Sequence, residues 1–126
     1  MEPHQILIVE DDADLAMALA DQLGHGGYRA VIVPTLAAAR NALVDAPGDF
    51  DLVLLDVSLP DGDGRTLCAD LRRNGDTLPV IILSGLVEED DVVQGLEDGA
   101  DAYMRKPFHS AELMARLRRL LPPENA

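Results

Sequence analysis

The chain has 126 residues, enough for one domain with a single core, and its 48% hydrophobic content excludes a disordered chain. Its net charge of −13, from 23 acidic and 10 basic residues, repels phosphate backbones and anionic lipid, so we expect no direct binding to nucleic acid or membrane. The apolar runs are too short to span a membrane, and the amino terminus lacks a secretory signal pattern. We therefore expect a cytoplasmic protein, and the lone Cys68, which can form no internal disulfide, agrees with a reducing compartment.

The first third of the chain predicts two strands and two helices. The apolar run of residues 6–9 predicts a strand that ends in three consecutive acidic residues. Asp12 can cap a helix with leucines at four-residue spacing, which stops at the glycines of residues 24–27. Residues 28–33 predict a second strand, and Thr35 opens an alanine-rich helix.

The third predicted strand ends in a carboxylate. Leu52 to Leu55 run without alternation into Asp56, which is typical of a strand buried on both faces. Pro60, Gly62 and Gly64 predict an irregular loop after it. Because ligands of open parallel sheets bind at the carboxyl ends of the strands, Asp56 is a candidate for chemistry, although an Asp can also simply cap a loop.

The next segments repeat this arrangement with a hydroxyl in place of the carboxylate. Leu67 and Leu71 indicate a helix, and the apolar residues 79–83 predict a strand that leads into Ser84. A further helix is expected after it, with acidic residues 88–91 in its first turn, where the helix dipole favours negative charge.

The last segments complete an alternating pattern. Residues 100–104 predict a fifth strand that leads into Lys106, and Ser110 is expected to cap the last helix. Five strands alternating with five helices predict an α/β fold: a doubly wound, five-stranded parallel sheet with helices on both faces. One rim of the sheet then carries the polar residues at the strand ends, namely Glu10, Asp11, Asp56, Ser84 and Lys106.

Three acids on one rim raise one another's pKa unless a cation neutralises them. Carboxylate ligands with room for water suit Mg²⁺, whereas Zn²⁺ favours His or Cys. The histidines, at positions 4, 25 and 109, lie in unrelated segments and are expected to be surface residues. We therefore expect a Mg²⁺ site formed by carboxylates.

A metal-supported carboxylate beside a hydroxyl and an ammonium group is suited to forming an acyl phosphate. Asp56 would be the nucleophile, while Lys106, the one lysine beside nine arginines, would pair with a phosphoryl oxygen. Ser84 would donate a hydrogen bond to another oxygen. Each of these residues alone could be an ordinary polar residue, and it is their combination at the strand ends that favours function.

The chain resembles a bacterial two-component response regulator receiver domain from about residue 5 to 121, with residues 122–126 as a tail of a single domain covering 1–126. The resemblance rests on four motifs, at residues 6–12, 51–64, 79–85 and 99–108. It implies a flavodoxin-like sheet of order 2-1-3-4-5 and phosphorylation of Asp56 by a histidine kinase or phosphotransfer protein. The other residue roles that it implies are an acid pair at Glu10 and Asp11, a metal contact from the Ser58 carbonyl, a switch pair at Ser84 and Tyr103, and Lys106 before a cis Pro107.

Such a domain is a signalling phosphoacceptor that catalyses only its own phosphorylation and dephosphorylation. The resemblance also implies that phosphorylation switches a face formed by the fourth helix, fifth strand and fifth helix for a downstream protein partner. No output domain is expected after residues 122–126.

Two positions depart from the family pattern. Asp12 directly follows the acid pair, which leaves open whether Asp11 or Asp12 ligates the metal; the strand alignment favours Asp11. Ala102 replaces an acid that often forms dimer ion pairs in related transcription factors. We therefore expect a monomer or a weak, phosphorylation-dependent dimer.

Three other classes of protein remain as alternatives. A haloacid-dehalogenase-like phosphatase also uses a strand-end Asp, but Ser58 occupies the position of its general acid. A dinucleotide-binding domain would need a glycine-rich turn where residues 9–12 are acidic. A receiver-like interaction module that is never phosphorylated is the third possibility, and only a phosphorylation experiment separates it from a working receiver.

Overall fold

A computed structural model describes residues 3–85 and 99–121 of the chain. A parallel five-stranded sheet lies at its centre, in the order β2-β1-β3-β6-β7. Counting these five strands along the chain gives the predicted order 2-1-3-4-5, so the doubly wound, flavodoxin-like fold is confirmed. The strands are β1 (Gln5–Val9), β2 (Arg29–Val33), β3 (Leu52–Asp56), β6 (Val80–Ser84) and β7 (Ala102–Arg105).

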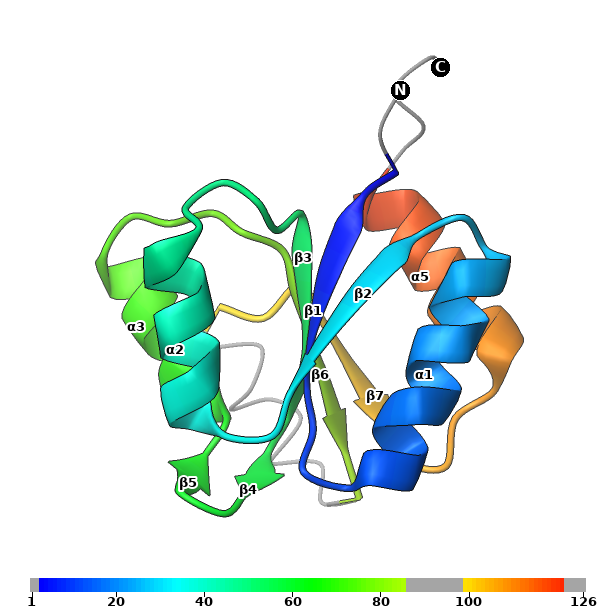
Figure 1. Ribbon diagram of the computed structural model, residues 1–126, viewed down its shortest axis with the longest axis horizontal. Coiled ribbons are helices and arrows are strands. Elements are labelled where there is room, and N and C mark those ends of the chain that lie inside the picture. Colours follow the sequence, from blue (N-terminus) through cyan, green and yellow to red (C-terminus); the bar gives the residue numbers. More distant parts are fainter. Residues whose placement is uncertain (1–2, 86–98, 122–126) are drawn as a thin grey trace.

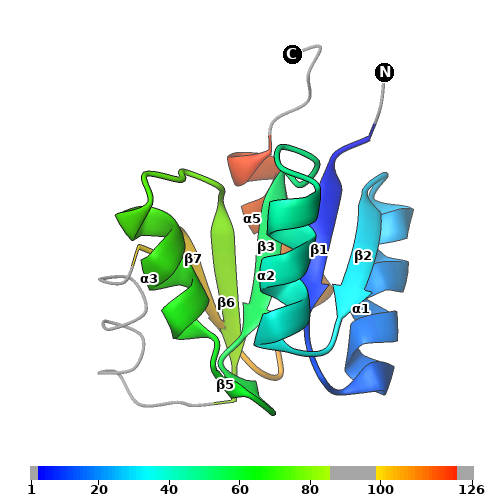
Figure 2. The ribbon, with the colours of Figure 1, turned by 60° about the vertical axis from the view of Figure 1, so that its left-hand side comes forward.

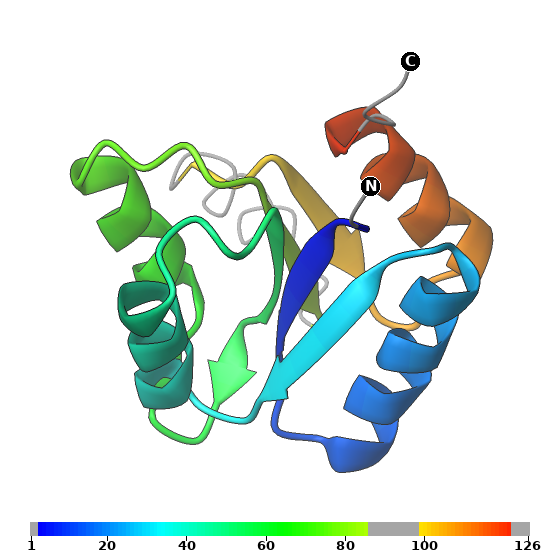
Figure 3. The same cartoon turned by 45° about the horizontal axis from the view of Figure 1, so that its top comes forward.

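Helices cover both faces of this sheet (Figures 1 and 3). Helices α1 and α5 pack on one face, and α2 and α3 pack on the other. Their bounds are α1 (Ala13–His25), α2 (Leu36–Asp45), α3 (Arg65–Arg73) and α5 (Ser110–Leu120). The helix predicted after Ser84, with its acidic first turn, lies outside the described residues.

The two faces of the sheet contribute to two separate cores, because side chains alternate along each strand. On β1, Ile6 and Ile8 join the core under α1 and α5, whereas Leu7 and Val9 join the core under α2 and α3. The strands β3 and β6 alternate in the same way, with all five residues of each strand buried. This double burial explains why these strands appear in the sequence as continuous apolar runs.

Two of the three predicted helix caps are confirmed. Asp12 accepts a hydrogen bond from the Leu15 amide (3.2 Å), and Thr35 accepts one from the Ala38 amide (3.0 Å). The prediction for Ser110 was wrong, since this residue is already the first of α5 and His109 precedes it without a side-chain cap. A serine at the first helical position cannot take the extended backbone conformation from which a cap residue accepts its hydrogen bond.

The segment after β3 is more regular than its sequence predicts. Two short antiparallel strands, β4 (Ser58–Leu59) and β5 (Gly62–Asp63), form a hairpin where an irregular loop was expected. Pro60 is tolerated because it lies in the turn, where no backbone N–H is needed for the strand pairing. Figure 2 shows this hairpin region at the carboxyl end of the sheet, below α2 and α3.

No helix within residues 3–85 and 99–121 is both long and apolar enough to cross a membrane.

Candidate functional site

The strand register brings two carboxylates together at the carboxyl edge of the sheet. Strands β1 and β3 pair with Val9 opposite Leu55, so the residues that follow, Glu10 and Asp56, are neighbours. Both are almost entirely buried, with 4% and 8% of their surface exposed. Together with the exposed Asp11 they offer three carboxylate oxygens that all lie within 4.8 Å of one another. The predicted cluster of acids is therefore present.

Lys106 reaches this cluster of acids from β7, the edge strand of the sheet. It follows β7, and its amide donates to the Ser84 carbonyl at 2.7 Å, which continues the β6–β7 ladder. Its Nζ atom lies 2.8 Å from Glu10 Oε1 and 3.4 Å from Asp56 Oδ1. The Lys106–Pro107 peptide bond is cis, as the family resemblance implied.

The site holds more negative charge than its one ammonium group can neutralise. Burial, together with a hydrogen bond to Asp56, raises the pKa of Glu10 to about 7, and the hydrogen bond from Lys106 offsets only part of that effect. Burial lowers the pKa of Lys106, but the hydrogen bond to Glu10 and the charge of Asp56 outweigh it, so the pKa of Lys106 is raised overall. The site is thus electrostatically suited to a further cation.

One oxygen of the cluster supports the same conclusion. Glu10 Oε2 is buried and has no hydrogen-bond partner within the described part of the chain. An unpartnered carboxylate oxygen is costly in a protein interior unless a cation or proton compensates it. The donor set of hard oxygen atoms fits Mg²⁺ or a similar divalent ion.

The Asp12 carboxylate is not part of this cluster of acids. It caps α1, and it is not among the three acids whose oxygens converge. This arrangement favours Asp11 over Asp12 as the third acid. The histidines lie apart from the cluster: His4 is 3.6 Å from Asp51, and His25 and His109 flank helix ends.

The β4–β5 hairpin places Ser58 beside the Asp56 carboxylate. The Ser58 amide donates to Asp56 Oδ1 at 3.4 Å, and the Gly64 amide donates to the Val57 carbonyl at 2.8 Å. A Cβ atom at Gly64 would overlap the Asp56 carbonyl oxygen, so only glycine allows the chain to turn this tightly. The backbone after Asp56 is consequently held against the carboxylate.

The two expected switch residues lie on neighbouring strands. Ser84 is 1% exposed at the end of β6. Tyr103 is half-buried on β7 and packs against the core under α2 and α3. Its hydroxyl is buried and has no hydrogen-bond partner within residues 3–85 and 99–121.

Sequence reasoning missed two residues of the hairpin. Arg65 pairs with Asp63 at 2.7 Å, and the carboxylate of Asp61 accepts hydrogen bonds from two amides of α2. The Asp63 pair is local, and its spacing of two residues is visible in the sequence. The residues that Asp61 contacts lie 24 and 25 positions away in the sequence, so no local sequence pattern predicts these contacts.

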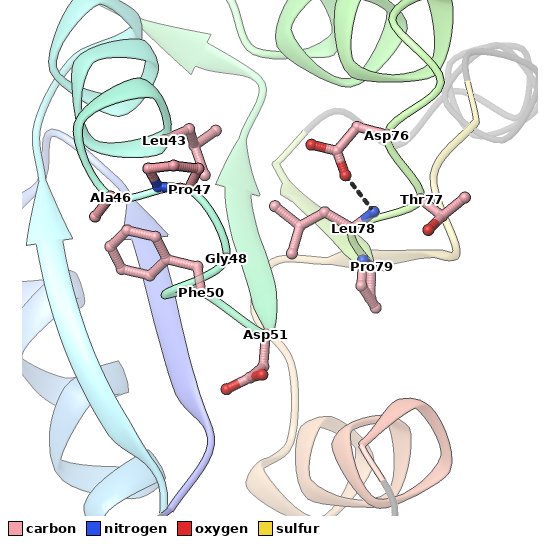
Figure 4. Close-up of a pocket in the computed structure, with 10 residues that line it drawn as sticks. All are labelled: Leu43, Ala46, Pro47, Gly48, Phe50, Asp51, Asp76, Thr77, Leu78 and Pro79. Carbon is pink, nitrogen blue, oxygen red and sulfur yellow. Dashed lines mark hydrogen bonds between the residues drawn. The ribbon is translucent and has the colours of Figure 1, made fainter.

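A separate open pocket of about 350 Å³ lies at the opposite, amino-terminal edge of the sheet (Figure 4). Phe50 and Leu78 face it from its two sides, and the Asp76 carboxylate turns back to accept from the Leu78 amide at 2.9 Å. None of the site residues described above lines this pocket.

Comparison with known proteins agrees with this geometry. The family model of the response regulator receiver domain matches residues 6–118. The chain is 41% identical over 116 residues to the response regulator RppA of Synechocystis sp., and the match covers 92% of this chain and 50% of that protein. It is 43% identical over 117 residues to the transcriptional regulatory protein TcrA of Mycobacterium tuberculosis, covering 92% of this chain and 45% of that protein. The chain thus spans about half the length of the curated relatives it matches.

Solved structures give the same result. The BeF3-activated N-terminal receiver domain of RstA from Klebsiella pneumoniae superposes with a TM-score of 0.87 at 36% identity, covering 95% of this chain and all of that one. The non-phosphorylated HemR receiver domain from Leptospira biflexa superposes with a TM-score of 0.82 at 36% identity, and the match covers 95% of each chain.

The fold and its acidic edge define a flavodoxin-like signalling domain. The chain belongs to the response regulator receiver domain family. This assignment supports neither a phosphatase nor a dinucleotide-binding protein, and the relatives are signalling proteins.

Proposed function

We propose that Asp56 accepts a phosphoryl group from a phosphohistidine of a histidine kinase or phosphotransfer protein. The observation that carries this proposal is the convergence of Glu10, Asp11 and Asp56 on one edge of the sheet, with the Lys106 ammonium beside them. Asp56 is the candidate nucleophile because it ends a central strand and lies within 3.4 Å of both Lys106 Nζ and the Ser58 amide.

In this reaction an Asp56 carboxylate oxygen attacks the phosphorus atom. A P–O bond forms as the P–N bond of phosphohistidine breaks, and the electron pair of the P–N bond stays on the imidazole nitrogen. The imidazole leaves as a neutral ring because its other nitrogen carries a proton, which the phosphohistidine brings with it. Lys106 Nζ and the Ser58 amide both lie within 3.4 Å of Asp56 Oδ1, which supports their proposed roles: Lys106 would pair with one phosphoryl oxygen, and the Ser58 amide would donate to another. The protein's share of the catalysis is then mainly positioning and charge compensation.

Glu10, Asp11 and Asp56, with the Ser58 carbonyl, would hold Mg²⁺. The ion would neutralise charge on the phosphoryl oxygens during transfer. The raised pKa of Glu10 and its unpartnered Oε2 atom support a cation at this place.

Ser84 and Tyr103 would read the phosphorylation state. A phosphoryl group on Asp56 adds charge and acceptor oxygens, which would draw the Ser84 hydroxyl inward and allow Tyr103 to change its packing. The surface that responds includes β7 and α5, where a downstream protein partner would bind. A negatively charged domain of this kind would act in the cytoplasm, with no catalysis beyond its own phosphorylation and dephosphorylation.

Intact-mass spectrometry after incubation with acetyl phosphate tests the proposal. The protein should gain one phosphoryl group when Mg²⁺ is present and much less when EDTA is added. Asp56→Asn should gain none, and Lys106→Ala should be labelled far more slowly. An unlabelled protein in Mg²⁺, folded by circular dichroism, would instead identify a receiver-like module that is never phosphorylated.

A further inference from the structure

The first turn of α2 is held by a residue far away in the sequence. Asp61, in the turn of the β4–β5 hairpin, accepts a hydrogen bond from the Leu36 amide through Oδ1 and one from the Ala37 amide through Oδ2, both at 2.9 Å. Figures 1 and 2 show the hairpin beside the beginning of α2. These two bonds, Leu36 first, hold the pKa of the Asp61 carboxyl below its usual range.

This contact does more than cap a helix. Thr35 already accepts from the Ala38 amide, so α2 has a local cap that is independent of the hairpin. Asp61 takes the next two free amides and thereby ties the hairpin turn to the helix. Packing strengthens the tie, because a Cβ atom at Gly62 would lie only 3.2 Å from Leu36 Cδ1.

The other end of the same hairpin lies at the acceptor carboxylate. Within the ladder, Leu59 pairs with Gly62 and Ser58 pairs with Asp63. The Ser58 amide in turn donates to Asp56 Oδ1. The hairpin is therefore fixed at its turn by α2 and at its base by Asp56, and two residue pairs separate these points.

We propose that Asp61 is a positioning residue, which holds the hairpin so that the Ser58 backbone stays against the Asp56 carboxylate, where Mg²⁺ would bind. The inference rests on the proposed function, because it assigns a purpose to the hairpin only if Mg²⁺ binds there. By linkage, Mg²⁺ binding must also stabilise the hydrogen bonds of Asp61 to α2.

The experiment compares Asp61→Ala with Thr35→Ala as the matched control. Both variants remove side-chain caps from the first turn of α2, but only the first releases the hairpin. Loss of an outer contact that orients metal ligands weakens metal affinity by about tenfold or more, so Asp61→Ala should raise the Mg²⁺ dissociation constant by about tenfold. Thr35→Ala should leave it unchanged. Calorimetric titration with MgCl₂ measures both.

Two further readouts separate positioning from simple destabilisation. With acetyl phosphate, Asp61→Ala should need more Mg²⁺ for half-maximal phosphorylation, yet approach the wild-type rate at saturating Mg²⁺. In the wild type, Mg²⁺ should slow hydrogen exchange of the Leu36 and Ala37 amides. Asp61→Asn, whose one side-chain oxygen can replace one of the two acceptors, should have an intermediate Mg²⁺ affinity and guards against a misfolded alanine variant.

The outcomes are distinct. Wild-type Mg²⁺ affinity in a folded Asp61→Ala would overturn the inference while leaving the proposed function intact. An equal loss of affinity in Thr35→Ala would also overturn it, since any damage to α2 would then suffice. A wild-type protein that binds no Mg²⁺ would overturn the proposed function and this inference together.

Discussion

Glu10 is a carboxylate that folding removes from water and places beside another carboxylate. Its pKa rises from an ordinary 4.5 to about 7, so between these values the folded protein binds more protons than the unfolded chain. The free energy of unfolding should therefore fall as pH rises from 4.5 to 7, with no further contribution from Glu10 above that range. The full shift corresponds to about 3 kcal/mol.

Urea denaturation across this pH range measures the effect. Glu10→Gln should flatten the fall in stability, whereas Glu112→Gln, which alters an exposed glutamate on α5, should not. Saturating Mg²⁺ should also flatten the profile, because a bound cation favours the ionised form. A wild-type profile that is flat from pH 4.5 to 7 would contradict the burial of Glu10 as the dominant cause.

Ser84 offers a test of the switch at the same scale. Ser84→Ala removes a buried hydroxyl at the end of β6 but leaves Asp56 and Lys106 in place, so the variant should still be labelled stoichiometrically by acetyl phosphate. Its conformational response should be blunted. NMR chemical-shift changes of the Tyr103 ring on adding beryllofluoride report this, with the exposed Ser110→Ala as control. A response of wild-type size in Ser84→Ala would disprove the coupling.

Which residues lie at the candidate site could be predicted only in part from the sequence. Strand-end placement identified Glu10, Asp56 and Lys106, because parallel strands bring their carboxyl ends to one edge. The sequence favoured Asp11 over Asp12 as a metal ligand by strand alignment, and the structure agrees with that preference, because Asp12 caps α1 and its oxygens are not among those that converge.

The short β4–β5 hairpin follows Asp56 directly in the chain, and the Ser58 amide contacts the Asp56 carboxylate. Gly64→Ala should push the backbone away from the Asp56 carbonyl, because the new Cβ atom would overlap that oxygen. Such overpacking typically costs about 1–3 kcal/mol, and we expect phosphorylation to slow as Ser58 shifts from Asp56.

A second glycine supplies the control. Gly24 lies in α1, and a Cβ atom there would meet nothing within 4 Å. Gly24→Ala should raise the free energy of unfolding by about 0.5–1 kcal/mol and leave phosphorylation unchanged. Thermal denaturation and the acetyl phosphate assay together compare the two variants. If Gly64→Ala were as stable and as active as the wild type, the tight turn would not matter.

At the scale of elements, long periodic segments were predicted well and short ones were not. The strands of the main sheet and the described helices were found from apolar runs and leucine spacing. The β4–β5 hairpin was missed because a ladder of two residue pairs is too short for a periodic pattern, and Pro60 and the glycines signalled only a turn.

The whole molecule carries a charge of −13, and its relatives include transcriptional regulators about twice its length. Ala102 is buried at 4% exposure and offers no charge for an ion pair between subunits. We expect light scattering to find a monomer without phosphoryl analogue, and at most a weak dimer with beryllofluoride. A tight dimer under both conditions, disrupted by changes on α5, would contradict this expectation.

The overall architecture followed from the sequence, because alternating strands and helices with short connections allow few topologies. The sheet order itself came from the family resemblance, since periodicity alone does not determine which strands are neighbours. The link between α2 and the β4–β5 hairpin through Asp61 could not be predicted, because it joins segments that only the folded chain brings together.

The most direct test of the central claim is to locate the phosphoryl group chemically. Sodium borohydride reduces an acyl phosphate to an alcohol, so an aspartyl phosphate becomes homoserine. After incubation with acetyl phosphate and Mg²⁺, reduction and peptide mapping by tandem mass spectrometry should find homoserine at Asp56 alone. Homoserine at Asp11, or at another acid with Asp56 unmodified, would contradict the account.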